Sequence, residues 1–171
     1  MNIRPAVEED RDAIWNIFRE VVAAGDTYAF DSQMSREDAL AYWFRADTHT
    51  YVAEQPRHAS RAEDRHLVGT YILKPNQSGG GSHVANAAFM VALNARGKGI
   101  GRDIGEHCLS EARRLGFRAI QFNFVVSTNE PAIRLWKQLG FNIVGALPGA
   151  FQHPEKGYVD VYIMFRSLRD N

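Results

Sequence analysis

The sequence has little cysteine, no surplus of charge and no long apolar run. Its single cysteine, Cys108, falls on the apolar stripe of a predicted helix, which favours a buried filler over a nucleophile. Lys and Arg number 20, and so do Asp and Glu, so charge does not favour nucleic acid or an anionic membrane. No segment approaches the roughly 20 apolar residues of a membrane span. The expected partner is therefore a small molecule.

The composition is that of one globular domain. Of the 171 residues, 45% are hydrophobic and 23% are charged, which is enough for one sizeable core. No repeat, linker or low-complexity tract divides residues 1–171, so we expect a single domain. The N-terminal stretch "MNIRPAVEEDRDAIW" carries charges where a signal peptide needs an apolar run, so we expect a cytoplasmic protein. No metal site is predicted.

Hydrophobic periodicity predicts an α+β fold with a mixed sheet. Ser35, followed three residues later by Asp38, resembles a capping box before the second helix. The predicted helices cover residues 8–24, 36–44, 100–115 and 130–139. The predicted strands cover residues 2–6, 49–54, 66–74, 83–93, 118–126, 141–147 and 158–165. The polar segment 55–65 and the Pro- and Gly-rich segment 148–157 are expected to be turns, and residues 25–34 a loop.

The stretch "NARGKGIGRDIGEH" places three glycines where a helix is about to begin. A helix N-terminus attracts phosphate when the preceding loop lets the ligand approach, and glycines remove the side chains that would block it. The stretch is no P-loop, because no hydroxyl follows Lys98. It is no dinucleotide fingerprint either, because Ile104 stands three residues after Gly101. A tight turn without any ligand is the alternative reading of the glycines.

Arg96-Gly97-Lys98-Gly99-Ile100-Gly101 resembles the R/Q-x-x-G-x-G/A motif of the GNAT superfamily of acetyl-CoA-dependent N-acetyltransferases. Downstream, "NEPAIRLWKQLGF" resembles the second signature of that superfamily. The segments "GSHVANAAFMV" and "QFNFVVSTNEPAIRLW" are similar to the members that detoxify proline analogues such as azetidine-2-carboxylate. The resemblance implies a central, mostly antiparallel sheet of about seven strands with about four helices, in the order β-α-α-β-β-β-α-β-α-β-β.

The resemblance also implies where acetyl-CoA binds. Backbone amides of the glycine loop would hold the pyrophosphate, and the strand around Phe89 would pair with the pantetheine arm and the thioester oxygen. Asn129 would bind the cofactor through its side chain, although a helix cap is an equal alternative. The implied cofactor residues are Phe89, Val91, Arg96, Gly97, Lys98, Gly99, Ile100, Gly101, Arg102, Asn129 and Trp136.

The expected acid and base of this superfamily are missing. Trp136 stands where its members commonly have a tyrosine acid, and an indole N–H does not release its proton. The strand that often carries a glutamate base offers Ala85, Asn86, Ala87 and Ala88. General acid–base help is worth about 10²–10⁴-fold, so positioning and oxyanion stabilisation could compensate for its loss.

Two asparagines interrupt apolar strands and are the candidate catalytic residues. Asn86 and Asn123 lie where asparagine is disfavoured, and the proline-analogue enzymes use asparagines on these two strands for substrate. The alternative is that each is a structural amide bonded to a bulge. Tyr28, Phe30 and Asp31 are expected to wall the acceptor pocket. His83 and His153 are expected to be structural or exposed.

The sequence thus predicts acetyl transfer from acetyl-CoA to a small amine, such as an amino acid or proline analogue, by direct attack on the thioester. The rival hypothesis is a catalytically impaired acyl-CoA sensor or regulatory module, which Trp136 and the acid-free strand support. The aromatic run "YVDVYIMF" would suit a homodimer, because many members of the superfamily dimerise through late strands.

Overall fold

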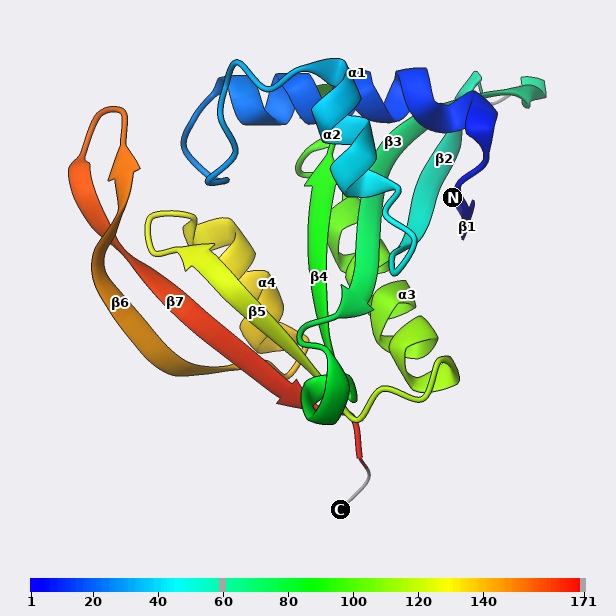
Figure 1. Cartoon of the computed structure of the whole chain (residues 1–171). Helices are drawn as coiled ribbons and strands as arrows, with labels where there is room; N and C mark the ends of the chain where they lie inside the picture. Colours follow the sequence, from blue (N-terminus) through cyan, green and yellow to red (C-terminus); the bar gives the residue numbers. More distant parts are fainter. Residues whose placement is uncertain (59–60, 170–171) are drawn as a thin grey trace.

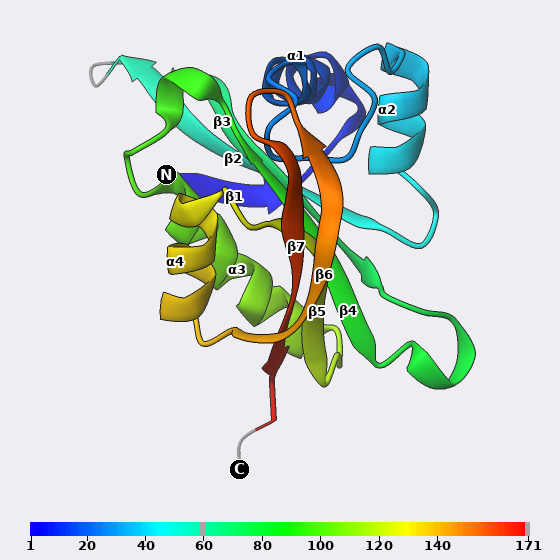
Figure 2. The ribbon, with the colours of Figure 1, turned by 90° about the vertical axis from the view of Figure 1, so that its left-hand side faces the viewer.

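One mixed sheet of seven strands lies between two pairs of helices in the computed structural model, which describes residues 1–58 and 61–169. Helices α1 and α2 cover one face of the sheet, and α3 and α4 cover the other (Figures 1 and 2). The elements are, in chain order, β1 (Asn2–Pro5), α1 (Arg11–Ala23), α2 (Arg36–Trp43), β2 (His49–His58), β3 (Arg61–Pro75), β4 (Val84–Val91), α3 (Ile100–Arg114), β5 (Ala119–Val126), α4 (Glu130–Gln138), β6 (Asn142–His153) and β7 (Gly157–Ser167). The predicted fold class and element order are confirmed.

The strand order is β1-β2-β3-β4-β5-β7-β6, and every neighbouring pair is antiparallel except β4 and β5. These two parallel strands pair only at Val84↔Ala119 and Ala85↔Ile120. Beyond that point they diverge, so the sheet opens between β4 and β5 (Figure 1). The opening leaves one edge of β4 without a strand partner in the middle of the sheet.

The helices begin and end where the local chemistry predicts. Ser35 caps α2, because its hydroxyl accepts a hydrogen bond from the Asp38 amide at 3.0 Å. Gly116 and Gly140 follow α3 and α4 with φ of 83° and 80°, the left-handed conformation that ends helices. Cys108 is buried on α3, as its place in the apolar stripe predicts.

The core lies on both faces of the sheet and continues under α1 and α3. Its largest fully buried side chains are Trp43, Tyr71, Phe18, Ile14, Ile72, Leu73, Met90, Ile100, Ile104, Ile120, Met164 and Val52. The buried indole of Trp43 donates to Thr70 Oγ1 at 3.0 Å, so α2 is joined to β3 by a satisfied polar contact as well as by packing. Within the described part of the chain, no helix is long and apolar enough to cross a bilayer.

Two predicted turns are in fact largely strand. Segment 148–157 was predicted as a turn, but β6 continues to His153 and β7 starts at Gly157, with a register shift between Leu147 and Phe151. Segment 55–65 was likewise predicted as a turn, but strand pairing continues to His58↔Arg61, and residues 59–60 lie outside the described chain. Bulges explain both errors, because they admit turn-forming residues into a ladder.

Smaller corrections concern the strand and helix ends. The first predicted helix starts as a short 3-10 turn, Glu8–Asp10, before α1. The long strand predicted for residues 83–93 ends at Val91, and a second 3-10 turn, Leu93–Ala95, leads into the glycine loop. His153 is buried, and its Nδ1 accepts from the amides of Glu155 and Lys156, so its role in the β6–β7 turn is structural.

Candidate active site

The glycine loop joins β4 to α3 and leaves space in front of the helix N-terminus. Gly97 and Gly99 have φ of 75° and 83°, and a Cβ on either would meet no atom within 4 Å. Gly99 is the N-cap of α3 and provides no side chain of its own to the first helical amides. The amides of Ile100 and Gly101, at the first two helical positions, have no partner within the helix and suit an anion.

Gly101 has a different role from the one that the sequence predicts. A Cβ at Gly101 would lie 3.3 Å from Leu135 Cδ2, so this position faces α4 rather than the open space of the loop. Glycine at 101 therefore allows α3 and α4 to pack closely. A side chain at position 101 would therefore meet α4 and would not occupy the phosphate position that the loop was predicted to leave free.

The cations of the loop have partners within the protein. Lys98 Nζ donates to the Asn94 carbonyl at 2.9 Å. Arg102 pairs with Glu106 at 3.4 Å and donates to Gln138 Oε1 at 2.6 Å. Burial raises the pKa of the Tyr28 phenol, and the nearby charge of Arg96 lowers it by a smaller amount. Lys98 and Arg102 would have to exchange these exposed contacts to reach a phosphate.

The backbone of Phe89 faces the opening between β4 and β5. No strand pairs with it there; instead the Phe89 amide donates to the Tyr28 hydroxyl at 3.2 Å, and that hydroxyl donates to the Phe89 carbonyl. Burial raises the pKa of Tyr28 to about 12, so the phenol stays protonated at neutral pH. Alternate residues of a strand present their backbone groups to the same side, so Val91 also faces the opening.

Trp136 fills the space beneath this opening. The indole lies on α4 with only 8% of its surface exposed, and its ring centre is 4.7 Å from that of Phe89 and 4.8 Å from that of Phe122. It therefore joins α4 to both diverging strands. Asn129 caps the same helix, because its Oδ1 accepts from the Ala132 amide at 3.4 Å, which leaves the amide nitrogen available for a ligand.

Asn86 and Asn123 belong to one chain of amides along the opening. Asn86 Nδ2 donates to the Gln121 carbonyl at 2.9 Å, and Gln121 Nε2 donates to Asn123 Oδ1 at 2.9 Å. Asn123 Nδ2 donates in turn to Asn76 Oδ1 at 2.6 Å. Asn123 lies in a bulge, since the β5–β7 register shifts between Phe122 and Val125. Gln121 thus links the two asparagines. Their hydrogen bonds are to other residues of the sheet, as the alternative of a structural amide describes.

The α1–α2 loop places two of its three predicted residues beside this opening. Tyr28 and Phe30 stack with ring centres 5.7 Å apart, and Phe30 meets the ring of Tyr42 edge-on at 5.2 Å. Asp31 is exposed and accepts from the Gln33 amide at 2.8 Å, so it stabilises a turn rather than lining the wall. Tyr28, Phe30 and Tyr42 together are called the aromatic wall below.

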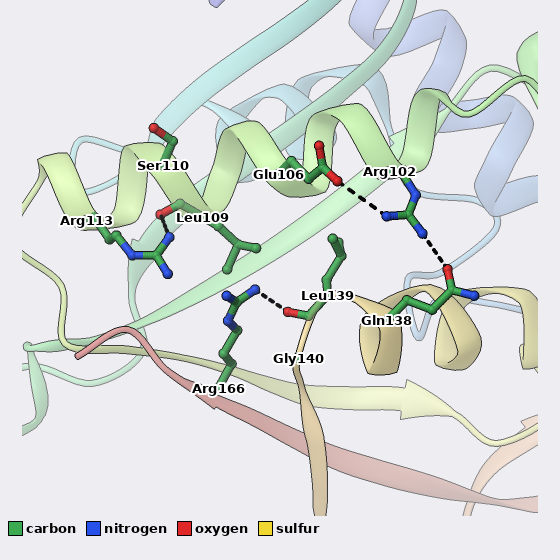
Figure 3. Close-up of a pocket in the computed structure, with 9 residues that line it drawn as sticks. All are labelled: Arg102, Glu106, Leu109, Ser110, Arg113, Gln138, Leu139, Gly140 and Arg166. Carbon is green, nitrogen blue, oxygen red and sulfur yellow. Dashed lines mark hydrogen bonds and ion pairs between the residues drawn. The ribbon is translucent and has the colours of Figure 1, made fainter. Parts of the chain in front are cut away.

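A separate groove of about 520 Å³ lies between α3, the end of α4 and β7 (Figure 3). Of the predicted site residues, only Arg102 lines it. Figure 3 shows Arg102 bridging Glu106 and Gln138, while Arg166 donates to the Leu139 carbonyl at the end of α4. These contacts join the two helices and the C-terminal strand, so the groove is distinct from the opening beside Phe89.

Two residues beside the opening, Gln121 and Lys74, were missed by reasoning from sequence. Gln121 connects the two asparagines, but a single glutamine in a strand gives no distinctive signal. Lys74 is the cross-strand partner of Asn86, and its Nζ lies 4.7 Å from the centre of the Tyr42 ring. A lysine near the end of a strand was a usable signal, because strand positions that point into a half-buried face rarely carry an ammonium.

Comparison with known proteins agrees with this geometry. Residues 12–141 match the model of the acetyltransferase (GNAT) family. Over 161 residues the chain is 35% identical to the N-acetyltransferase aca1 of Schizosaccharomyces pombe, covering 87% of this chain and 77% of that protein. A GCN5-related N-acetyltransferase from Kribbella flavida is 43% identical, with a TM-score of 0.89 and 97% and 96% of the two chains covered. A phosphinothricin acetyltransferase from Sinorhizobium meliloti, solved in complex with AcCoA, shares the fold at 20% identity, with a TM-score of 0.82 and coverage of 97% and 87%.

Proposed function

Because the chain belongs to the acetyltransferase (GNAT) family, whose acyl donor is acetyl-CoA, we propose that it acetylates the amine of a small molecule. The observation that carries the proposal is the backbone edge of β4 at Phe89, which has no strand partner and contacts only the Tyr28 hydroxyl, beside a glycine loop with open space at the N-terminus of α3. An amino acid or a proline analogue is the acceptor class that we infer. The reaction is direct attack of the neutral amine on the thioester.

The chain's own residues fit the donor. The amides of Ile100 and Gly101 would hold the pyrophosphate, with Gly97 and Gly99 leaving room for it. The backbone N–H and C=O groups of Phe89 and Val91 on the open side of β4 would pair with the pantetheine arm as an added strand does. The Phe89 amide, which the Tyr28 hydroxyl now occupies, would donate to the thioester oxygen and to the oxyanion that develops there. Acetyl-CoA supplies the activated acyl group.

We propose that two polar side chains of the α1–α2 loop face the acceptor amine. Asp26 Oδ1 and Thr27 Oγ1 are buried and have no hydrogen-bond partner among the described residues. Both precede Tyr28, whose hydroxyl contacts the backbone of Phe89, the segment that we propose holds the thioester. A buried acceptor without a donor is costly, and the ammonium of an arriving amine would satisfy it. The carboxylate of Asp26, two residues before Tyr28, is the group that we propose takes the proton that the amine loses.

The rival function is a sensor that binds acyl-CoA without turnover. The packing of Trp136 between Phe89 and Phe122 favours it, because no tyrosine hydroxyl stands there to protonate the leaving thiolate. Thiol release from acetyl-CoA, measured against a panel of amino acids and amines, separates the two functions. We expect release with at least one amine. CoA binding without thiol release for any amine would favour the sensor, and no thermal shift with CoA would contradict both.

Replacement of Asn86 or Asn123 tests their place in the acceptor site. We expect Asn86→Ala and Asn123→Ala to lower kcat/KM for the amine by about 5- to 150-fold, equivalent to about 1–3 kcal/mol, because lost bonds to substrate raise the barrier. CoA affinity should be unchanged. Asn86→Ala should also lower Tm, since its side chain joins β4 to β5 at the start of the opening. Lower Tm with unchanged amine kinetics would make both residues purely structural.

The strand predicted from the sequence to form a homodimer interface is not at an edge of the sheet. The aromatic run "YVDVYIMF" forms β7, which is paired on both sides by β5 and β6. One of the two edge strands of the sheet is β6, where Val144 is 60% exposed beside the exposed Ile143 and Leu147. We propose that two copies associate through this edge, and sedimentation at micromolar concentration checks it. A monomer at those concentrations would contradict the proposal.

A further inference from the structure

Lys74 is a half-buried cation on the face of the sheet that α1 and α2 cover. It stands one residue before the end of β3, and its Nζ lies 3.5 Å from the Tyr42 hydroxyl and 4.7 Å from the centre of that ring. Among the residues whose side chains the structure describes, no carboxylate pairs with it. Its known neighbours are neutral, so the ammonium has capacity for an anion.

Lys74 lies beside the opening between β4 and β5. Its Cα pairs with that of Asn86, and directly opposed residues of an antiparallel pair project from the same face. Asn86 is the first residue of β4 beyond the last pair with β5. The next residue of β4 on that face is Ala88, opposite Ile72. The side chain of Ala88 is a single methyl group, and it is the only one on this face of β4 between Asn86 and Met90.

The aromatic wall runs from the backbone of Phe89 to Lys74. At one end the Tyr28 hydroxyl contacts the backbone of Phe89. Phe30 stacks on Tyr28 and meets Tyr42, and at the other end Tyr42 contacts Lys74. An acceptor lying along this wall would have one end at the acyl group and the other at an unpaired ammonium.

We propose that Lys74 binds the carboxylate of the acceptor, so that the substrate is an amino acid or another amine that carries a carboxylate. The inference rests on the proposed acetyl transfer and deepens it by naming the group that the site recognises. A charge-assisted hydrogen bond from the ammonium would fix the carboxylate, and the second N–H of the Asn86 side-chain amide, whose first N–H donates to the Gln121 carbonyl, would donate to the same carboxylate. The amine is then directed toward Phe89.

Kinetics with matched acceptor pairs test the proposal. Each amino acid that supports thiol release is compared with its primary amide, in which a neutral carboxamide replaces the carboxylate. We expect Lys74→Met to lower kcat/KM for the acid by about 10- to 100-fold, because a hydrogen bond to a charged group is lost, and to change kcat/KM for the amide by less than about threefold. Lys74→Arg keeps the charge and should keep the preference for the acid.

The acid-to-amide ratio within one variant controls for folding, and comparison of that ratio between the wild-type protein and Lys74→Met cancels the different basicity of the two amines. Equal loss for acid and amide in Lys74→Met, with Tm and CoA affinity retained, would overturn the role of Lys74. Failure of the proposed function looks different, because then no amine of either kind would release thiol from a protein that still binds CoA.

Discussion

Gly99→Asp should bind CoA at least about 100-fold more weakly than the wild-type protein while melting at nearly the same temperature. The left-handed conformation of Gly99 is one that Asp tolerates better than most residues, and Asp is a favoured N-cap, so the fold should be retained. The added carboxylate would stand in the open space before α3. There it would repel a phosphate by about 1–4 kcal/mol at 4 Å. Calorimetric titration with CoA measures the loss.

Gly116→Asp is the matched control. Gly116 has the same φ of 83° and equally empty surroundings, but it lies at the other end of α3. This variant should bind CoA normally and lose about 1–2 kcal/mol of stability, because a residue with a Cβ is strained at this φ and an acid is disfavoured near a helix C-terminus. Gly101→Val should instead lower Tm, since its side chain would meet Leu135. Unchanged CoA affinity in Gly99→Asp would remove the glycine loop from the cofactor site.

The order of helices and strands could be predicted from the sequence because each element has its own hydrophobic period and its own residues at its ends. The apolar stripe of α3 and the glycines after α3 and α4 are local signals, and they predicted these helices to within one or two residues. The strand β6 was partly missed because Pro148 and Gly149 are typical of turns. They lie in an irregular part of an edge strand, where a proline costs no ladder bond on the open side.

The site was less predictable because its contacts join residues far apart in the chain. Tyr28 reaches Phe89 across 61 positions, and the bond from Asn86 reaches Gln121 across 35. The motifs located the glycine loop and the β4 edge, which are local. The pairing of Lys74 with Asn86 depends on the register of a hairpin, and one residue of slip would have placed the ammonium on the opposite face.

The side chain of Trp136 should matter for stability and for shape rather than for proton transfer. Its ring contacts Phe89, Phe122 and Phe141, and α3 approaches it so closely that a Cβ at Gly105 would lie 3.2 Å from the indole. Trp136→Ala should therefore lower the free energy of unfolding by about 3–5 kcal/mol, as expected for a large aromatic removed from a core. Denaturant titration measures this loss.

Trp136→Phe is the variant that separates packing from chemistry. A phenyl ring retains most of the contacts with Phe89 and Phe122 and removes the indole N–H, which cannot serve as an acid. We expect it to cost less stability than the alanine variant and to keep kcat within about threefold, because the barrier does not depend on that group. If Trp136→Phe lost turnover while Tm and CoA affinity stayed at wild-type values, the indole would be part of the catalytic machinery, and the leaving thiolate would have a partner at this position after all.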